Sequence, residues 1–316
     1  MIKFRVVKSP LKEDTESKPR SGSVSRRQLL KAAPLGGLAL LLRGGELVLP
    51  PVGGGEPSET PYLSGPLDPI SDEGAMPRGV HALHKIRDFD RTYEDDFRLE
   101  ESQLRLLEKT ADRIERAMRF VGHGHFNLVS FDELLRYAHR FAEIGSFTRA
   151  ETDLMEELFY ADAAIYGFLG KKVLGRLTAS FDPREVKKIP ATGHYLLRGE
   201  PLAKYERIRR DLGDGVFLTS GVRGVVKQYQ LFLSKAVRTR GNLSQASRSL
   251  APPGYSYHAI GDFDVGRVGL GKKNFTADFA RTAEYRRLID LGYVAIRYTE
   301  TNPFGVRHEP WHIKIA

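Results

Sequence analysis

The sequence predicts an α+β protein, because an amino-terminal helical pattern is followed by short strands that alternate with helices. In the helical part, apolar side chains recur three and four residues apart, at Leu104, Leu107, Ala111, Ile114 and Met118. In the later part, residues 216–219, 292–298 and 311–315 have the composition of short strands, with helical patterns over 225–236 and 276–290. We therefore expect a helical region over 95–189 and a mixed domain over 190–316.

Two capping boxes support the helical region. Ser130 stands three residues before Glu133, and Thr148 stands three residues before Glu151. Each pair precedes a leucine-containing run, as expected at the start of a helix. We expect three or four helices before residue 180, with the apolar stripe buried in the core of the protein.

Residues 1–45 have the composition of an export signal. They hold ten Lys or Arg side chains against three acids, and the stretch Ser25-Arg26-Arg27-Gln28-Leu29-Leu30-Lys31 precedes an apolar run over 32–42. This spelling resembles the twin-arginine signal, which implies a periplasmic or envelope location for the mature protein. The run is shorter than the ~20 residues that cross a bilayer, although an uncleaved signal remains an alternative that would tether the protein to a membrane.

Composition also excludes several classes of site. Residues 44–79 are rich in Gly, Pro and Ser, and we expect a poorly ordered linker over 46–94. Outside the first 45 residues, 39 basic side chains nearly balance 37 acidic ones, so no nucleic-acid partner is expected. The chain has no cysteine, which excludes disulfides, thiolate metal sites and a cysteine nucleophile.

Histidines and acids that suit a catalytic metal lie near the carboxyl end. His258 is followed by Asp262 and Asp264, and His312 stands three residues after Glu309. A catalytic zinc site uses three nitrogen or oxygen ligands, leaves one position open, and has a carboxylate base nearby. The residue types are present, but only the sequence motifs around them make the pattern specific for one class of metal site.

The sequence around these residues resembles the VanY-type D-alanyl-D-alanine carboxypeptidase family of zinc peptidases in three motifs, which occur in the same order as in the family. Ser220-Gly221-Val222-Arg223, with Gln228 five residues later, is similar to the family's first motif. Ser256-Tyr257-His258 with Gly261 is similar to its second motif, and Glu309-Pro310-Trp311-His312 is similar to its third. The resemblance covers roughly residues 190–316 and implies a hedgehog/DD-peptidase-like core with an antiparallel sheet and a Zn²⁺ cofactor.

The resemblance also implies a role for each matching residue. His258 and His312 correspond to zinc ligands, and Glu309 corresponds to the general base that deprotonates the attacking water. Arg223 corresponds to the cation that polarises the scissile carbonyl or holds a substrate carboxylate. Supporting, substrate-binding positions in the cleft correspond to Ser256 and Gln228.

The third ligand departs from the family pattern. The family has an aspartate seven residues after the histidine, where this chain has Val265, which cannot ligate a metal. Asp264 is one residue early, and Asp262 is the alternative. In a strand these two carboxylates share one face and Phe263 lies on the other. We expect Asp264 to be the ligand, after a one-residue deletion in the preceding turn.

Glu309 and His312 must approach one metal, although an ideal strand sends residues three apart to opposite faces. Pro310 donates no backbone hydrogen bond, so we expect a bend and an irregular strand start over 309–311. Trp311, the only tryptophan, is expected in the wall of the site. The remaining histidines are expected outside the metal site: His81, His84, His123, His125, His139, His194 and His308. Of these, His308 adjoins Glu309 and is a candidate to tune the pKa of that base.

The activity that the resemblance implies is hydrolysis of D-Ala-D-Ala-type bonds in peptidoglycan stem peptides. A carboxypeptidase also needs a cation for the terminal carboxylate, and the candidates are Arg223, Arg248 and Arg297. One alternative is an endopeptidase of the same family, which would use much the same metal centre. Another is a non-catalytic zinc-containing envelope protein, against which the intact Glu309 counts.

Overall fold

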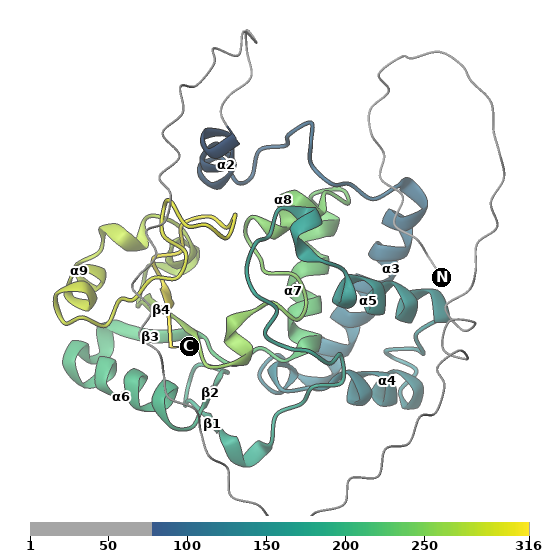
Figure 1. Cartoon of the computed structure of the whole chain (residues 1–316). Coiled ribbons are helices and arrows are strands. Elements are labelled where there is room, and N and C mark those ends of the chain that lie inside the picture. The colour runs from purple at the N-terminus through teal and green to yellow at the C-terminus, as the bar shows by residue number, and fades with distance from the viewer. Residues whose placement is uncertain (1–77, 316) are drawn as a thin grey trace, which may run out of the picture. The chain divides into compact units, whose positions relative to one another are not determined.

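The computed structural model describes residues 78–315 (Figure 1). The predicted export signal and most of the predicted linker lie outside this range. Within it, no helix combines the length and apolar character that a bilayer crossing demands.

A cluster of helices forms the larger hydrophobic core. Its members are α3 (Glu101–Val121), α4 (Phe131–Arg140), α5 (Arg149–Tyr160), α7 (Val225–Arg238) and α8 (Leu243–Ser247). The α3 helix packs along α7, so the predicted stripe is buried at Leu107 and Ile114. The capping boxes at Ser130 and Thr148 are confirmed, since each side chain accepts a hydrogen bond from the backbone three residues on.

A three-stranded antiparallel sheet forms the second core. Its strands, in the order β3-β4-β5, are β3 (Val216–Ser220), β4 (Phe263–Arg267) and β5 (His312–Ile313). Helices α6 (Glu200–Leu212) and α9 (Ala283–Asp290) contribute Ile208 and Leu288 to this core. A separate hairpin pairs β1 (Val186–Lys188) with β2 (Tyr195–Leu197). The predicted α+β class is confirmed.

Short 3-10 turns join these elements. They are η1 (His125–Asn127), η2 (Ala163–Tyr166), η3 (Pro183–Glu185), η4 (Gly213–Gly215), η5 (Tyr257–Ala259), η6 (Gly271–Phe275) and η7 (Phe279–Arg281). The predicted strand over 292–298 does not form, and the predicted strand over 311–315 shrinks to two residues. The backbone there makes isolated contacts, such as Lys314 N–H to the Ala295 carbonyl, in place of a ladder.

The part of the predicted linker that the structure describes differs from the expectation. Residues 78–94 contain α2 (Arg78–Arg87) and a turn, and the segment that follows is tied to α8. Arg248 donates to the carboxylate of Asp96 at 2.6 and 3.1 Å and to the carbonyls of Phe89 and Arg91. The composition of this segment could not predict that it is ordered, because Asp96 and its partner Arg248 lie about 150 residues apart in the chain.

The Arg248–Asp96 pair is buried, so its loss has a predictable cost. Arg248→Ala leaves the Asp96 carboxylate without its main partner, and we expect the free energy of unfolding to fall by about 3–5 kcal/mol. Hydrogen bonds from Arg248 and Asn242 hold the pKa of Asp96 below its usual value against the effect of burial. Its contribution is therefore present at neutral pH and is lost as the pH falls below about 4.

Chemical denaturation of the wild type and the variant at several pH values measures this effect. The matched control is Arg105→Ala, which breaks an exposed pair with Glu101 and should cost less than about 1 kcal/mol. Equal costs for the two variants would contradict the role of Arg248.

Candidate metal centre and active-site cavity

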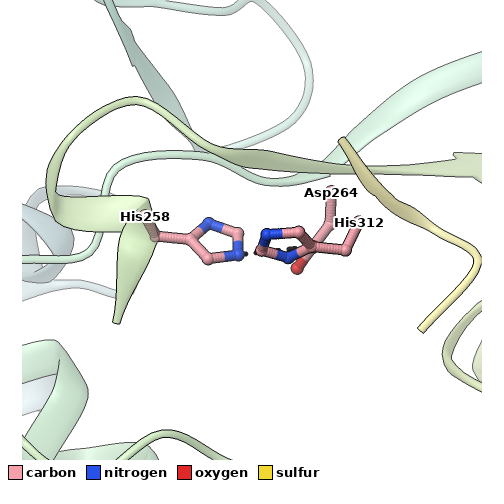
Figure 2. A group of neighbouring side chains, drawn as sticks. All are labelled: His258, Asp264 and His312. Atoms are coloured by element: carbon pink, nitrogen blue, oxygen red, sulfur yellow. Dashed lines mark hydrogen bonds and ion pairs between the residues drawn. The ribbon is translucent and has the colours of Figure 1, made fainter. Parts of the chain in front are cut away.

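The pairing of β4 with β5 brings two predicted metal ligands together, because Asp264 stands opposite His312 in the ladder. His258 reaches the same point from η5, the turn that precedes β4. One donor atom from each of these three buried side chains lies within 4.8 Å of the others. Figure 2 shows the two imidazole rings and the carboxylate converging.

The ring of His258 is held in one tautomer. Its Nδ1 lies 2.8 Å from the carbonyl oxygen of Gly221, which can only accept, so Nδ1 carries the proton and Nε2 a lone pair. Burial, together with the nearby Arg223, lowers the pKa of His258 and keeps the ring neutral. Only glycine fits at position 221, since a Cβ there would lie 2.0 Å from the carbonyl oxygen of Tyr195.

The ring of His312 is held by two acids. Its Nε2 lies 2.9 Å from Oδ2 of Asp262, and its Nδ1 lies 3.2 Å from Oδ1 of Asp264. Burial alone would lower the pKa of His312, but the bonds to these carboxylates raise it to about 9. Asp262 is also paired with Arg297 at 2.9 Å and keeps its pKa below the usual range. Asp262 therefore orients the ring from the side away from Asp264.

The three donors fit a divalent metal. Nε2 of His258 is buried without a hydrogen-bond partner and lies 3.3 Å from Oδ1 of Asp264. Although burial opposes ionisation, the Arg223 guanidinium and the hydrogen bond with His312 help to hold the pKa of Asp264 well below its usual value. A lone pair that faces a carboxylate oxygen is repelled unless a cation lies between them. Two imidazoles and a carboxylate are a ligand set for such a cation, with Asp262 as the outer carboxylate that a histidine ligand commonly contacts.

Glu309 stands beside this cluster without belonging to it. Its Oε2 lies 4.0 Å from Nδ1 of His312, and burial raises the pKa of its carboxyl group. The backbone turns through Pro310 and Trp311, and the N–H of His312 donates to the carbonyl of Glu309. The predicted bend over 309–311 is confirmed, and it explains how residues three apart reach one point.

Arg223 contacts the cluster through Asp264. A register shift at the end of β3 places Ser220 opposite Asp264, and Arg223 follows in the next loop. The guanidinium donates from Nε to the Ser220 hydroxyl at 2.8 Å and from Nη2 to Asp264 at 2.6 Å. The first motif is thus a loop that brings a cation to Asp264, the predicted third ligand.

Comparison with known proteins agrees with this geometry. Residues 205–315 match the family model described as VanY, D-alanyl-D-alanine carboxypeptidase. The matched residues are similar to this family and make up about a third of the chain; we call residues 205–315 the matched region. The match agrees with the resemblance that the three sequence motifs predict. A comparison with curated proteins gave no match.

Three solved structures are similar to part of the chain. One is a mutant of the vancomycin resistance D,D-pentapeptidase VanY from a VanB-type resistance cassette, in complex with Zn(II), with 23% identity over 40% of this chain and 76% of that chain and a TM-score of 0.33. Another is the LdcB LD-carboxypeptidase, with 20% identity over 42% and 69% of the two chains and a TM-score of 0.35. The third is VanYB in complex with D-alanine-D-alanine, with 23% identity over 42% and 77% and a TM-score of 0.34.

A cavity of about 560 Å³ opens at the cluster of His258, Asp264 and His312. Its wall includes the predicted site residues Arg223, Gln228, Ser256, His258, Asp264, Glu309 and His312. Gln228 uses its amide to join two loops, donating to the Arg223 carbonyl at 2.9 Å and accepting from Gly254 N–H at 2.8 Å. Its position therefore favours a role in holding the Arg223 loop in place.

Two cations named from the sequence are engaged elsewhere. Arg248 is buried against Asp96, and Arg297 is paired with Asp262 and lies 3.5 Å from the centre of the Tyr257 ring. Neither lines the cavity, so of the three candidate cations only Arg223 is placed to meet a substrate there.

Sequence reasoning missed other residues of the wall. His194, expected to be an ordinary residue, lines the cavity, and burial lowers its pKa to about 4. Phe89 and Asp90 line it from the segment after α2, outside the matched region over 205–315. Arg307 lines it two residues before Glu309. Family motifs contain none of these positions, so only the folded chain identifies them.

Proposed function

We propose that this chain is a zinc metallopeptidase that removes the terminal residue from peptidoglycan stem peptides ending in D-Ala-D-Ala. The observation that carries the proposal is the meeting of His258, Asp264 and His312 with Glu309 at their edge, inside one cavity. The description of the matching family supports the D-Ala-D-Ala bond. The twin-arginine signal read from the sequence supports an envelope location, where peptidoglycan is found.

Zinc is the proposed metal because the donor set contains two imidazoles and one carboxylate and no sulfur. When bound, zinc supplies Lewis acidity, which makes water a better nucleophile and a carbonyl a better electrophile. His258 through Nε2, Asp264 and His312 through Nδ1 are the residues that would hold it. The outer bonds to Gly221 and Asp262 keep both rings turned toward the ligand position.

Two residues beside the metal position have separate roles: Glu309 transfers the proton, and Arg223 stabilises the developing charge. Glu309 accepts the proton of the attacking water and returns it to the leaving amine, which suits a buried carboxyl group whose pKa is raised. Arg223 stabilises the negative charge that develops on the carbonyl oxygen, since its guanidinium lines the cavity beside Asp264.

Product analysis tests the proposal directly. The purified protein is loaded with zinc and incubated with a stem pentapeptide ending in D-Ala-D-Ala, and the products are identified by mass. We expect the tetrapeptide and free D-alanine. Cleavage of cross-linked dimers with the pentapeptide left intact would instead favour an endopeptidase, and no cleavage of either would contradict a peptidase.

Asp262 offers a finer test of the metal centre. Because Asp262 orients His312 from its Nε2 side, Asp262→Asn should weaken zinc binding by about 10- to 100-fold without abolishing it. Competition with a zinc-binding dye measures the affinity. An unchanged affinity would show that the outer carboxylate does not position the histidine.

A further inference from the structure

We propose that Arg307 binds a carboxylate group of the substrate, and that Phe89, from outside the matched region over 205–315, holds it in position. This assignment rests on the proposed function, because it takes the cavity to be the peptide-binding cleft. Arg307 would select negatively charged peptides, a role separate from the reaction at the metal.

Two aromatic rings hold the guanidinium of Arg307. Its central carbon lies 4.8 Å from the centre of the Phe89 ring and 4.8 Å from the centre of the Trp311 ring. The side chain is only 19% exposed, and it forms part of the cavity wall. Cation–π contacts from two rings orient a planar guanidinium and reduce the freedom that it loses on binding.

The guanidinium is nevertheless left with an unused donor. Nε of Arg307 is buried and has no hydrogen-bond partner. The nearest acid is Glu309, whose Oε1 lies 3.7 Å from that Nε, beyond hydrogen-bonding distance. An unsatisfied buried donor in the wall of a cavity is costly, and a ligand oxygen would remove the cost.

Other partly buried cations of the wall already have partners. Arg223 is paired with Asp264 at 2.6 Å, and Lys235 is paired with Asp90 at 2.7 Å. Lys227 donates to the side chain of Gln230 at 2.8 Å. Among these side chains of the described chain, Arg307 is the one with a buried donor still to be satisfied.

The position of Phe89 depends on the segment between α2 and α3. The carbonyl of Phe89 accepts a hydrogen bond from Nε of Arg248, and the neighbouring Asp90 is paired with Lys235 of α7. These contacts fix the ring over Arg307 from a segment that precedes the matched region by more than one hundred residues. The amino-terminal part of the described chain therefore completes the wall of the cleft.

A carboxylate is the ligand that best matches this site. A guanidinium presents paired N–H donors that fit the two oxygens of a carboxylate. In a stem peptide the carboxylate can be that of the carboxyl terminus or that of an acidic side chain. The chemistry is the same, and modified substrates separate the two sources.

Steady-state kinetics on three peptides test the proposal. They are the D-Ala-D-Ala pentapeptide, the same peptide with a carboxyl-terminal amide, and the same peptide with its acidic side chains amidated. The wild type should prefer the free acid to one of the two amidated forms. The disfavoured form then identifies the carboxylate that Arg307 binds. Arg307→Gln should remove this preference by raising KM for the free acid at least about tenfold, and Phe89→Ala should raise it by less.

The matched control is Arg281→Gln, which removes one positive charge from an exposed side chain outside the cavity and should leave the preference unchanged. An equal loss of activity on all three peptides in Arg307→Gln would overturn the proposal, because it would mean that Arg307 acts on Glu309 alone. A wild type without any acid preference would also overturn it.

A binding measurement separates this proposal from the proposed reaction. Trp311 is the only tryptophan and contacts Arg307, so its fluorescence should report ligand binding in Glu309→Gln protein titrated with the three peptides. Acid-dependent binding that Arg307→Gln abolishes would support the proposal even if no peptide is cleaved. Cleavage by the wild type with equal affinity for acid and amide would refute it while leaving the peptidase function intact.

Discussion

Glu309→Gln should lower the rate of peptide hydrolysis by about 10²- to 10⁴-fold while the protein stays folded and keeps its zinc. Glutamine has nearly the same shape as glutamate but cannot take up a proton at neutral pH. Glu309 lies 4.0 Å from His312 and is not one of the three converging donors, so its loss should spare the metal. Turnover of the pentapeptide and metal content, measured on the same preparation, check both parts of this expectation.

The matched control is Glu300→Gln. Glu300 is 80% exposed and lies near His308, outside the cavity wall, so its variant should keep wild-type turnover. Near wild-type turnover in Glu309→Gln as well would remove Glu309 from the role of base. Loss of zinc from Glu309→Gln would instead place Glu309 among the ligands.

His258→Ala should remove both the bound zinc and the activity. The Nε2 lone pair of His258 has no other partner, and a site with two remaining ligands cannot hold the ion at micromolar concentration. Metal analysis after exhaustive dialysis should find about one zinc per wild-type chain and almost none in the variant.

His194→Ala provides the control for this variant. His194 lines the same cavity but is not among the converging donors, so its variant should retain the zinc content of the wild type. Circular dichroism of all three proteins shows whether the fold is kept. Full zinc content in folded His258→Ala protein would contradict the proposed ligand set.

Local patterns predicted several features around the site. The capping boxes are formed by side chains three residues apart, and the structure has them as predicted. The choice of Asp264 over Asp262 followed from the family spacing, from which Asp264 departs by one residue; the structure buries Phe263 in the core and pairs Asp264 with His312. The bend at Pro310 followed from its missing N–H, and it is present.

Long-range pairings were beyond local reasoning. Arg248 lies near His258 in the sequence, which made it a candidate for the cleft. Its buried ion pair with Asp96, 152 residues earlier, gives it a structural role instead. The clamp around Arg307 likewise needs Phe89, which composition assigned to a poorly ordered linker. The segment over 292–298 has the composition of a strand, but it lacks a neighbouring strand with which to form a ladder.

The central claim is that His258, Asp264 and His312 hold one metal ion with Glu309 beside it. Anomalous X-ray diffraction from crystals of the zinc-loaded protein, recorded on both sides of the zinc absorption edge, tests it most directly. We expect a single strong peak within about 2.0–2.2 Å of Nε2 of His258, an oxygen of Asp264 and Nδ1 of His312. A peak elsewhere in the molecule, or no peak at these residues in zinc-loaded crystals, would contradict the account.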